Sequence, residues 1–234
     1  MPDAPWVMTQ TWHDLLFAHW PVDAATLRDK VPSAFDLDLF SGTAWLGIVP
    51  FHMTNVSARG VPPLPGISAF PELNVRTYVR VGDRAGVYFF SLDAGSTLAV
   101  RAARLLFNLP YYRATQRVSA AGNAIEYESD RRGRTRGGSF SATYRPVGPP
   151  RAPAPGTLEY FLTERYCLYN LSRRGDPYRL EIHHPPWPLQ PASAEFARNT
   201  MAEAAGLTLP DTLPLLHFSK RQDMVGWATE KLRT

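Results

Sequence analysis

Leu73-Asn74-Val75-Arg76-Thr77-Tyr78-Val79-Arg80-Val81 alternates between two sets of side chains along nine residues. Successive side chains of a β-strand point to opposite faces, so Val75, Thr77 and Val79 would share one face and the residues between them the other. The turn-forming segment Gly82 to Gly86 follows, and Val87 to Leu92 returns to strand-forming residues. This pattern predicts a β-hairpin in the middle of the chain.

Further strand-like segments lie on both sides of this hairpin. Thr43 to Ser57 is rich in apolar and β-branched residues, although Pro50 indicates an edge position or a bend. The opening segment Gln10 to Pro21 is aromatic but mixed, and we assign it no element. Strands are also predicted at Tyr111 to Val118, Ala124 to Ser129, Ser139 to Tyr144, Tyr166 to Ser172 and Tyr178 to His183, with one or two short strands from Leu215 onward.

Helices are predicted to be few and short. Residues that can cap a helix N-terminus begin three of them, and the clearest helix ends before Gly206. Many strands with a few short helices indicate an α+β fold dominated by an antiparallel sheet, which could close into a barrel or cone around a cavity. The predicted helices are Asp23 to Val31, Ser96 to Phe107, Thr157 to Leu162 and Ala192 to Ala205.

The 234 residues suit one large domain or two small ones. A hydrophobic content of 44% with 20% charged residues is typical of a globular protein with its own core. The Pro-rich connector at about 146–156 is the best internal boundary. Two domains could meet there, but we expect a long loop within one domain that spans residues 1–234.

Composition and motifs exclude or weaken several classes of protein. Cys167 is the one cysteine, so no intramolecular disulfide can form, and a reducing, cytoplasmic location is expected. We expect no secretory signal, since Met1 to Trp6 lacks a basic region followed by an apolar stretch, and no membrane span, since the apolar runs are short. The net charge is +4, and the arginines of Arg131 to Arg136 are expected to form a solvated hairpin tip rather than a phosphate site. Nucleotide-binding and serine-hydrolase signatures are also missing.

Two short clusters combine side chains that can line a pocket. Thr163-Glu164-Arg165-Tyr166 is one, and His183-His184-Pro185-Pro186-Trp187-Pro188 is the other. Either cluster can equally be scaffold, because a prolyl turn makes a rigid corner and Glu164 and Arg165 can pair across a sheet. Neighbouring His183 and His184 face opposite sides of a strand, so a metal site around one of them would need distant partners. We expect neither metal nor cofactor.

Longer strings of residues resemble the YqjF-like family, an uncharacterised group within the acetoacetate decarboxylase-like superfamily. This resemblance covers about residues 8 to 228, whereas the link to the decarboxylase itself is remote and rests on residues 70 to 114. It implies a decarboxylase-like barrel with a cavity, and an oligomer is expected with it. The strings include Leu15 to Pro21, Ala44 to Gly47, Glu72 to Val79, Phe90 to Ala94, Leu109 to Tyr112, Glu164 to Tyr166 and His184 to Leu189.

The remote resemblance also implies site residues, and one departure from it bears on mechanism. The decarboxylase forms a Schiff base through a Pro-Lys-Lys-x-Ala turn, which matches Pro110-Tyr111-Tyr112-Arg113-Ala114 here. A phenol cannot form an imine. The chain has three lysines (Lys30, Lys220 and Lys231), and none lies in the matching segment. The resemblance therefore implies the fold and a cavity, while the residues argue against Schiff-base decarboxylation.

Two functional hypotheses follow. In the first, an enzyme acts on a small organic acid or carbonyl compound, with Glu72 as general base and a hydroxyl of Tyr111 or Tyr112 donating to the substrate oxygen. Arginine can hold a carboxylate by two parallel hydrogen bonds, and the candidates are Arg76, Arg104 and Arg113. In the second, the protein binds a small molecule without turnover. A purely structural role also stays open, in which Arg104 pairs with Glu72 and the tyrosines pack the core. The other substrate-binding candidates, from the two clusters, are Glu164, Arg165, Tyr166, His183, His184 and Trp187.

Overall fold

The computed structural model describes residues 2–64, 66, 68–96, 109–133, 137–172 and 174–232. Strands dominate it, and the three described helices are four to six residues long. The elements are β1 (Met8–Val22), α1 (Ala24–Arg28), β2 (Asp36–Leu37), β3 (Ala44–Ala58), β4 (Phe70–Val81), β5 (Arg84–Ala94), β6 (Tyr111–Ala121), β7 (Ala124–Arg131), β8 (Ser139–Pro146), α3 (Leu158–Thr163), β9 (Cys167–Leu171), β10 (Pro177–His183), β11 (Gln190–Asn199), α4 (Met201–Ala204), β12 (Leu215–Gly226) and β13 (Glu230–Lys231).

Nine of the described strands close into a barrel. The order is β5-β6-β7-β8-β11-β12-β1-β3-β4, and β4 pairs again with β5 to complete the ring. The predicted barrel is thus confirmed, and its pairings are mostly antiparallel, as expected. Within the barrel the exception is the pair β5 and β6, which runs parallel, and β5 also runs parallel to β9 outside it. The label α+β fits loosely, because the helices are minor.

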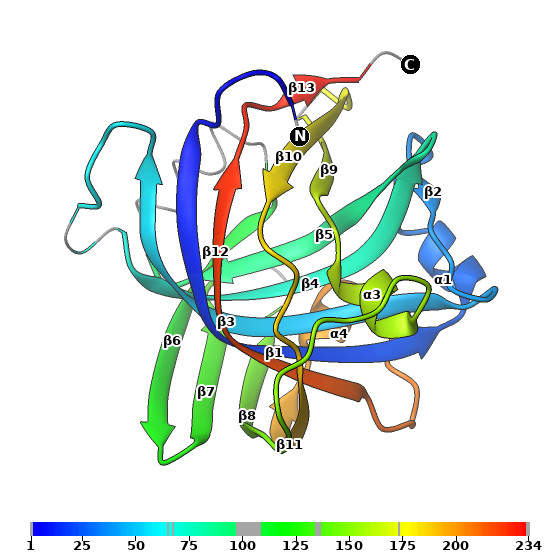
Figure 1. The fold of residues 1–234 in the computed structure, drawn as a ribbon. Helices are drawn as coiled ribbons and strands as arrows, with labels where there is room; N and C mark the ends of the chain where they lie inside the picture. Colours follow the sequence, from blue (N-terminus) through cyan, green and yellow to red (C-terminus); the bar gives the residue numbers. More distant parts are fainter. Residues whose placement is uncertain are drawn as a thin grey trace.

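A second ring shares one wall of this barrel. Strands β9 and β10 connect β5 to β12, because β5 pairs with β9 and β10 pairs with β12. In Figure 1, β9 and β10 lie in the upper half of the molecule with the upper ends of β1 and β12, and the lower half contains β6, β7, β8 and β11. Strands β1, β3, β4, β5 and β12 therefore belong to both rings.

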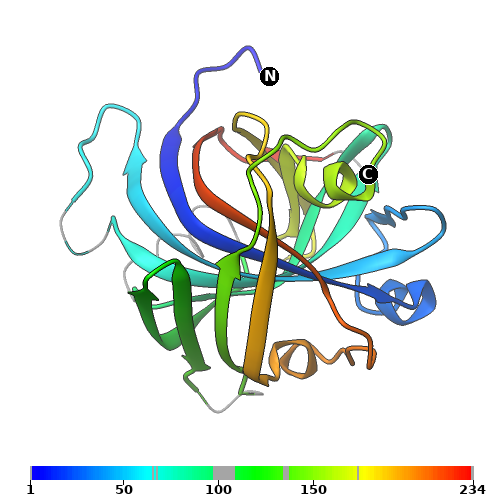
Figure 2. The same ribbon diagram turned by 60° about the horizontal axis from the view of Figure 1, so that its bottom comes forward.

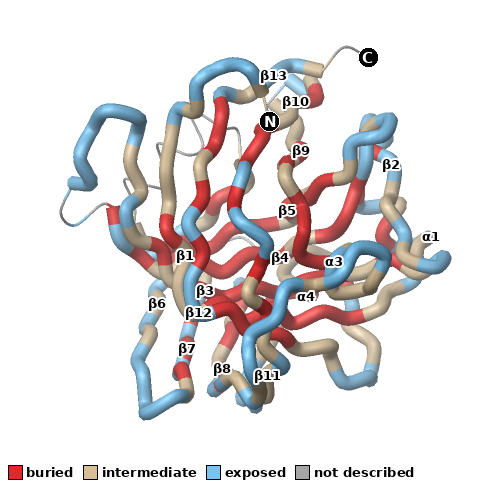
Figure 3. The backbone as a smooth tube through the Cα atoms, in the orientation of Figure 1, coloured by how far each residue is buried: buried red, intermediate tan, exposed pale blue. Residues whose placement is uncertain are grey.

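The shared strands are buried on both faces. One face packs a solid core in the lower ring, which includes Leu16, Ile48, Leu73 and Phe218. The opposite face bears Phe17, Val49 and other apolar residues that surround the upper ring. Figure 3 shows buried stretches along these strands, which are interrupted on β12 at the exposed residues Lys220 and Arg221. Since neighbours along a strand alternate, one strand can serve both interiors.

Two of the predicted helix caps are confirmed. The Asp23 carboxylate accepts a hydrogen bond from the Thr26 backbone N–H at 2.9 Å and begins α1. The Thr157 hydroxyl accepts from the Tyr160 N–H at 3.3 Å and begins α3. The helix predicted over Ser96 to Phe107 lies almost entirely outside the described residues.

The helix predicted over Ala192 to Ala205 is wrong. Residues 190–199 form β11, which pairs with β8 and with β12, and a helix of four residues, α4, follows it. Figure 2 shows α4 beside the end of β11. The side chains of Ala192, Ala194 and Phe196 alternate towards the lower core. This two-residue period, together with pairing on both sides, outweighs the helix propensity of the alanines.

Strand β1 has no clear signature in the sequence. Its residues from Leu15 to Trp20 are buried without a break, because β1 serves both rings. The backbone of Asp14 has φ +51°, and the pairing of β1 with β3 shifts between His13 and Ala18. A bulge of this kind interrupts the alternation on which strand prediction depends.

Segment 147–156, expected as a long connector, crosses from β8 to α3 and holds one bridge, between Arg151 and Leu189. In the part of the chain that the structure describes, no helix has the length and apolar character to cross a membrane.

Candidate functional site

The upper ring encloses a cavity of about 880 Å³. Its walls come from strands β1, β3, β4, β5, β9, β10 and β12 and from the first residue of β6, so residues far apart in sequence face one space. Most of the lining side chains are apolar. A small number of polar groups face this space, in the arrangement typical of ligand pockets.

Strand β4 carries a row of three polar residues along the cavity. Glu72, Asn74 and Arg76 are two residues apart and all line it. Residues at i, i+2 and i+4 share a face of a strand, which is why the alternation in this segment brings them together. The sequence singled out Glu72 and Arg76, whereas Asn74 was missed, although the same period points to it.

Glu72 is hydrogen-bonded to Tyr111. The Tyr111 hydroxyl lies 2.7 Å from Oε2 of Glu72, and both side chains are buried. The pKa of Glu72 is raised to about 8: burial raises it most, the Tyr111 hydrogen bond lowers it, and the charge of nearby Asp93 adds a smaller rise. Burial and the Glu72 carboxyl likewise raise the pKa of Tyr111 well above its usual value. At neutral pH the pair therefore holds both protons.

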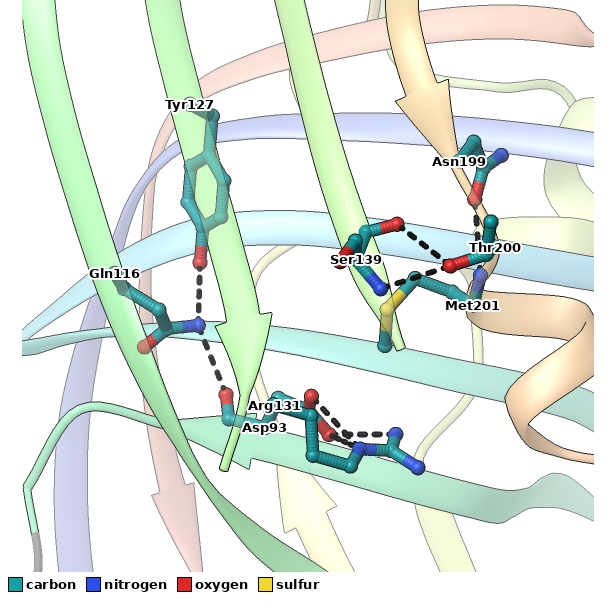
Figure 4. Close-up of polar contacts among 8 residues, drawn as sticks. All are labelled: Asp93, Gln116, Tyr127, Arg131, Ser139, Asn199, Thr200 and Met201. Carbon is teal, nitrogen blue, oxygen red and sulfur yellow. Dashed lines mark hydrogen bonds and ion pairs between the residues drawn. The ribbon is translucent and has the colours of Figure 1, made fainter. Parts of the chain in front are cut away.

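Asp93 and Arg131 form a buried ion pair on the other side of the wall. Arg131 Nε lies 3.0 Å from both Asp93 carboxylate oxygens, and Nη2 lies 2.7 Å from Oδ1 (Figure 4). Gln116 donates from Nε2 to the Asp93 backbone carbonyl and to the Tyr127 hydroxyl (Figure 4). The Arg131 side chain is 3% exposed, so the expectation of a solvated tip is wrong for this residue. Residues 134–136 of that predicted tip lie outside the described residues.

The segment that resembles the decarboxylase site supplied further candidates, and those that the structure describes do not line the cavity with Glu72. Tyr112 lies under the Arg131 guanidinium, 4.2 Å from the ring centroid, on the face opposite to Tyr111. Arg113 is exposed on β6. Arg104 lies outside the described residues, so the structure describes nothing of the proposed Arg104–Glu72 pair.

Arg76 is held against aromatic rings at the cavity wall. Its guanidinium carbon lies 5.3 Å from the Phe17 ring centroid and 5.7 Å from that of Tyr78. Nη2 donates to the Leu162 carbonyl at the end of α3, at 3.2 Å. Nε is buried and has no partner among the described residues, and no described carboxylate lies within ion-pair distance of Arg76.

The neighbourhood of Arg76 is fixed by a short chain of hydrogen bonds. The Tyr78 hydroxyl donates to the Leu162 carbonyl at 2.8 Å and therefore accepts from Nε2 of His19, which lies 2.7 Å away. Nδ1 of His19 is then the unprotonated ring nitrogen. Burial and the nearby Arg76 charge lower the pKa of His19 well below its usual value, so this histidine is neutral.

The first predicted cluster divides between scaffold and cavity wall. Arg165 lines the cavity but is bound by Asp38 at 2.5 Å and packs on the Phe161 ring. Glu164 accepts from the Trp187 backbone N–H at 2.9 Å and is hydrogen-bonded to the Tyr166 hydroxyl. Glu164 and Tyr166 do not line the cavity, and their contacts hold the corner that carries Trp187.

The second predicted cluster also divides. His184 and Trp187 line the cavity and are buried, whereas His183 is exposed. The Trp187 ring stacks on Trp12 at 5.7 Å, and burial lowers the pKa of His184. Within the described ranges, no three His, Cys, Asp or Glu side chains converge as a metal site requires. The apolar wall, including Trp12 and Phe51, was not predicted, because it depends on strand pairings distant in sequence.

Sequence comparisons relate this chain to an uncharacterized family. The model of the DUF2071 family, described as an uncharacterized conserved protein, matches residues 9–223. The uncharacterized protein YqjF of Bacillus subtilis (strain 168) is 48% identical over 231 residues, which cover 99% of this chain and 95% of YqjF. The expected resemblance to the YqjF-like family is confirmed.

Solved structures with a similar fold include enzymes. An acetoacetate decarboxylase-like enzyme from Sphingomonas wittichii RW1 has a TM-score of 0.65 at 12% identity, over 99% of this chain and 95% of that one. The enduracididine biosynthesis enzyme MppR has a TM-score of 0.66 at 9% identity, over 97% and 90%. A structure of acetoacetate decarboxylase has a TM-score of 0.64 at 13% identity, over 99% and 90%. At these identities the likeness establishes the fold.

Proposed function

Because the chain belongs to the DUF2071 family of uncharacterized conserved proteins, we propose a function from its own residues: acid–base catalysis on a small organic acid or carbonyl compound in the cavity. The observation that carries this proposal is the Glu72 carboxyl, which faces the cavity, is hydrogen-bonded to Tyr111 and has a pKa raised to about 8. A carboxyl group whose pKa lies near the working pH can both release and accept a proton.

The chemistry is a proton transfer next to a carbonyl group. In its ionised form Glu72 removes a proton from the carbon beside the carbonyl, which leaves an enolate and a neutral Glu72. Return of that proton to the same or another carbon restores the carboxylate, so no oxidant or second substrate is needed. Tyr111 lies close enough to Glu72 to stabilise its ionised form and to donate to a developing oxyanion.

The lysines support a route without an imine. Lys220 is paired with Asp14 at 2.6 Å and Lys231 with Asp176 at 2.7 Å, and both are exposed, as is Lys30 next to α1. None of the three lines the cavity. An imine requires a primary amine at the reacting carbon, so the proposed chemistry is not Schiff-base decarboxylation.

The second candidate is a binding protein that holds its ligand unchanged. The largely apolar cavity wall favours it, because such a wall supplies affinity without any chemical group. Native mass spectrometry of the freshly purified chain, with and without denaturation, would reveal a retained ligand. An extra mass that the protein releases chemically unaltered, and does not alter on prolonged incubation, would favour binding alone.

Deuterium exchange tests the enzyme proposal. Small keto acids are incubated with the protein in D₂O, and loss of the proton beside the carbonyl is followed by NMR. We expect exchange with the wild type and a loss of at least about 100-fold in Glu72→Gln. Glu128→Gln, which changes an exposed glutamate of β7, is the matched control and should exchange like the wild type. Equal exchange in Glu72→Gln, with its melting temperature unchanged, would overturn the assignment of Glu72.

A further inference from the structure

We infer that the ligand of this cavity is a carboxylic acid with an extended hydrocarbon body, whose carboxylate pairs with Arg76. This inference rests on the proposed function and narrows its substrate from a small acid to a long one, in which the carbonyl group beside Glu72 lies on the hydrocarbon chain and not next to the carboxylate. It rests on the shape of the cavity, on the character of its walls and on the position of its one unpaired cation among the described residues.

The cavity is elongated along the strands. On β1 its lining extends from Met8 to Phe17, and on β3 from Ala58 to Val49. Nine residues of extended chain span at most about 30 Å, and bends in these strands shorten that length. Met8 pairs with Ala58 at one end, and Gly47 pairs with Arg76 towards the other. A ligand that fills this space is therefore long rather than compact.

The walls between these ends are apolar. Val49, Phe51 and Met53 alternate along β3 towards the cavity, and Leu180 and Ile182 face it from β10. About 30 water molecules at about 30 Å³ each would occupy 880 Å³. A four-carbon acid would leave most of this volume to water against apolar walls, whereas a hydrocarbon body displaces that water.

The Arg76 guanidinium is positioned to bind an anion. Arg76 keeps a buried Nε without a described partner, and the Phe17 and Tyr78 rings hold its guanidinium in place. Trp187, also in the cavity wall, has a buried indole N–H without a described partner. These two groups are donors, so an acceptor such as a carboxylate satisfies them. The third buried wall atom without a described partner, Oδ1 of Asn74, is an acceptor and is left to another group of the ligand.

The opposite end is an apolar opening. Val61 is 49% exposed and Leu64 is 50% exposed, and both line the cavity, as does Val7. Exposed apolar side chains around an entrance suit the passage of a hydrocarbon chain. Glu72 is four residues from Arg76, about 13 Å along β4, so the chain of the ligand rather than its carboxylate would pass the Glu72–Tyr111 pair.

A series of straight-chain carboxylates tests this inference on the full chain. Butanoate, hexanoate, octanoate and decanoate are titrated at pH 7 and followed by calorimetry and by tryptophan fluorescence, which reports on Trp12 and Trp187 in the wall. Each added methylene should lower Kd about fourfold, since burying one is worth about 0.8 kcal/mol. Equal Kd values across the series, or no binding of decanoate, would overturn the inference.

The head group is tested from the ligand side, which avoids any folding defect. Decan-1-ol has the same body without the charge and should bind at least tenfold more weakly than decanoate. Arg76→Met should abolish that preference, whereas Arg80→Met, at an exposed arginine of the same strand, should keep it. Equal affinity of the wild type for the acid and the alcohol would overturn the role of Arg76.

Failure of this inference can be told apart from failure of the proposed function. Binding of the carboxylate series needs no turnover, so a fourfold gain per methylene with no deuterium exchange on any keto acid would uphold the ligand class and reject the enzyme. Exchange on short keto acids, with Kd values that do not depend on chain length, would uphold the enzyme and reject the ligand class.

Discussion

Tyr111 and Tyr112 are adjacent in sequence but serve opposite sides of the barrel wall. The Tyr111 hydroxyl is hydrogen-bonded to Glu72 in the cavity at 2.7 Å, whereas the Tyr112 ring lies under the guanidinium of Arg131. Strand alternation forces this division, because β6 begins at Tyr111. One tyrosine therefore belongs to the proposed chemistry, and the other to the packing that supports it.

Tyr111→Phe should raise the pKa of Glu72 above about 8. The Tyr111 hydrogen bond lowers that pKa, and its loss leaves burial and Asp93 to act unopposed. A ¹³C NMR titration of the glutamate carboxyl carbons measures the change directly. Tyr112→Phe is the matched control and should leave the Glu72 titration unchanged. A Glu72 pKa that is the same in the two variants would contradict this account of the pair.

Glu72→Gln should change how stability depends on pH. The folded pKa of Glu72 is raised to about 8 from an ordinary value of 4.5, so the stability gained from its protonated form is fully present below about 4.5. It is lost as the pH rises through about 8, and the loss amounts to several kcal/mol, since one pKa unit is worth about 1.4 kcal/mol. Urea denaturation between pH 4 and 9 should show the wild type losing stability relative to Glu72→Gln. Glu128→Gln should follow the wild type at every pH.

Arg131→Gln should destabilise the fold by about 3–5 kcal/mol. It leaves the Asp93 carboxylate, which is fully buried, without its charged partner. Arg198→Gln is the control, because Arg198 contacts Asp130 at 3.5 Å with both side chains half exposed, and such a pair is worth at most about 1 kcal/mol. Chemical denaturation compares the two variants. Similar losses of about 1 kcal/mol in both variants would contradict the prediction that the Asp93 carboxylate depends on Arg131 for its stabilisation.

Gly47→Ala should weaken carboxylate binding by displacing Arg76. A Cβ at position 47 would lie 3.1 Å from the His19 ring and 3.3 Å from Cγ of Arg76, which is closer than such contacts normally allow. We expect decanoate affinity to fall severalfold while decan-1-ol affinity stays the same. Gly137→Ala, where an added Cβ meets nothing within 4 Å, should alter neither. Equal losses for acid and alcohol would indicate a general change in the cavity.

The sequence by itself determined the local features of this protein. Alternation in Leu73 to Val81 predicted β4 and placed Asn74 and Arg76 on one face, and side-chain caps at Asp23 and Thr157 began two helices as expected. These features depend on neighbours within a few residues, which the sequence shows directly. Composition limited any imine mechanism to three lysines, and the resemblance to the decarboxylase, whose lysine positions match Tyr111 and Tyr112 here, argued against such a mechanism.

The tertiary structure decided what depends on distant partners. Pairing with β8 and β12 made a strand of Gln190–Asn199, where local propensity had favoured a helix. Because β1 belongs to two rings, both of its faces are buried and its sequence lacks the apolar–polar alternation of a strand. The same shared strands form part of the cavity wall. Arg131 has the local sequence of a solvated tip, and it is the barrel that brings Asp93 beside it. Burial of this kind, which also raises the pKa of Glu72, arises from contacts between strands tens of residues apart and has no signature in any one segment.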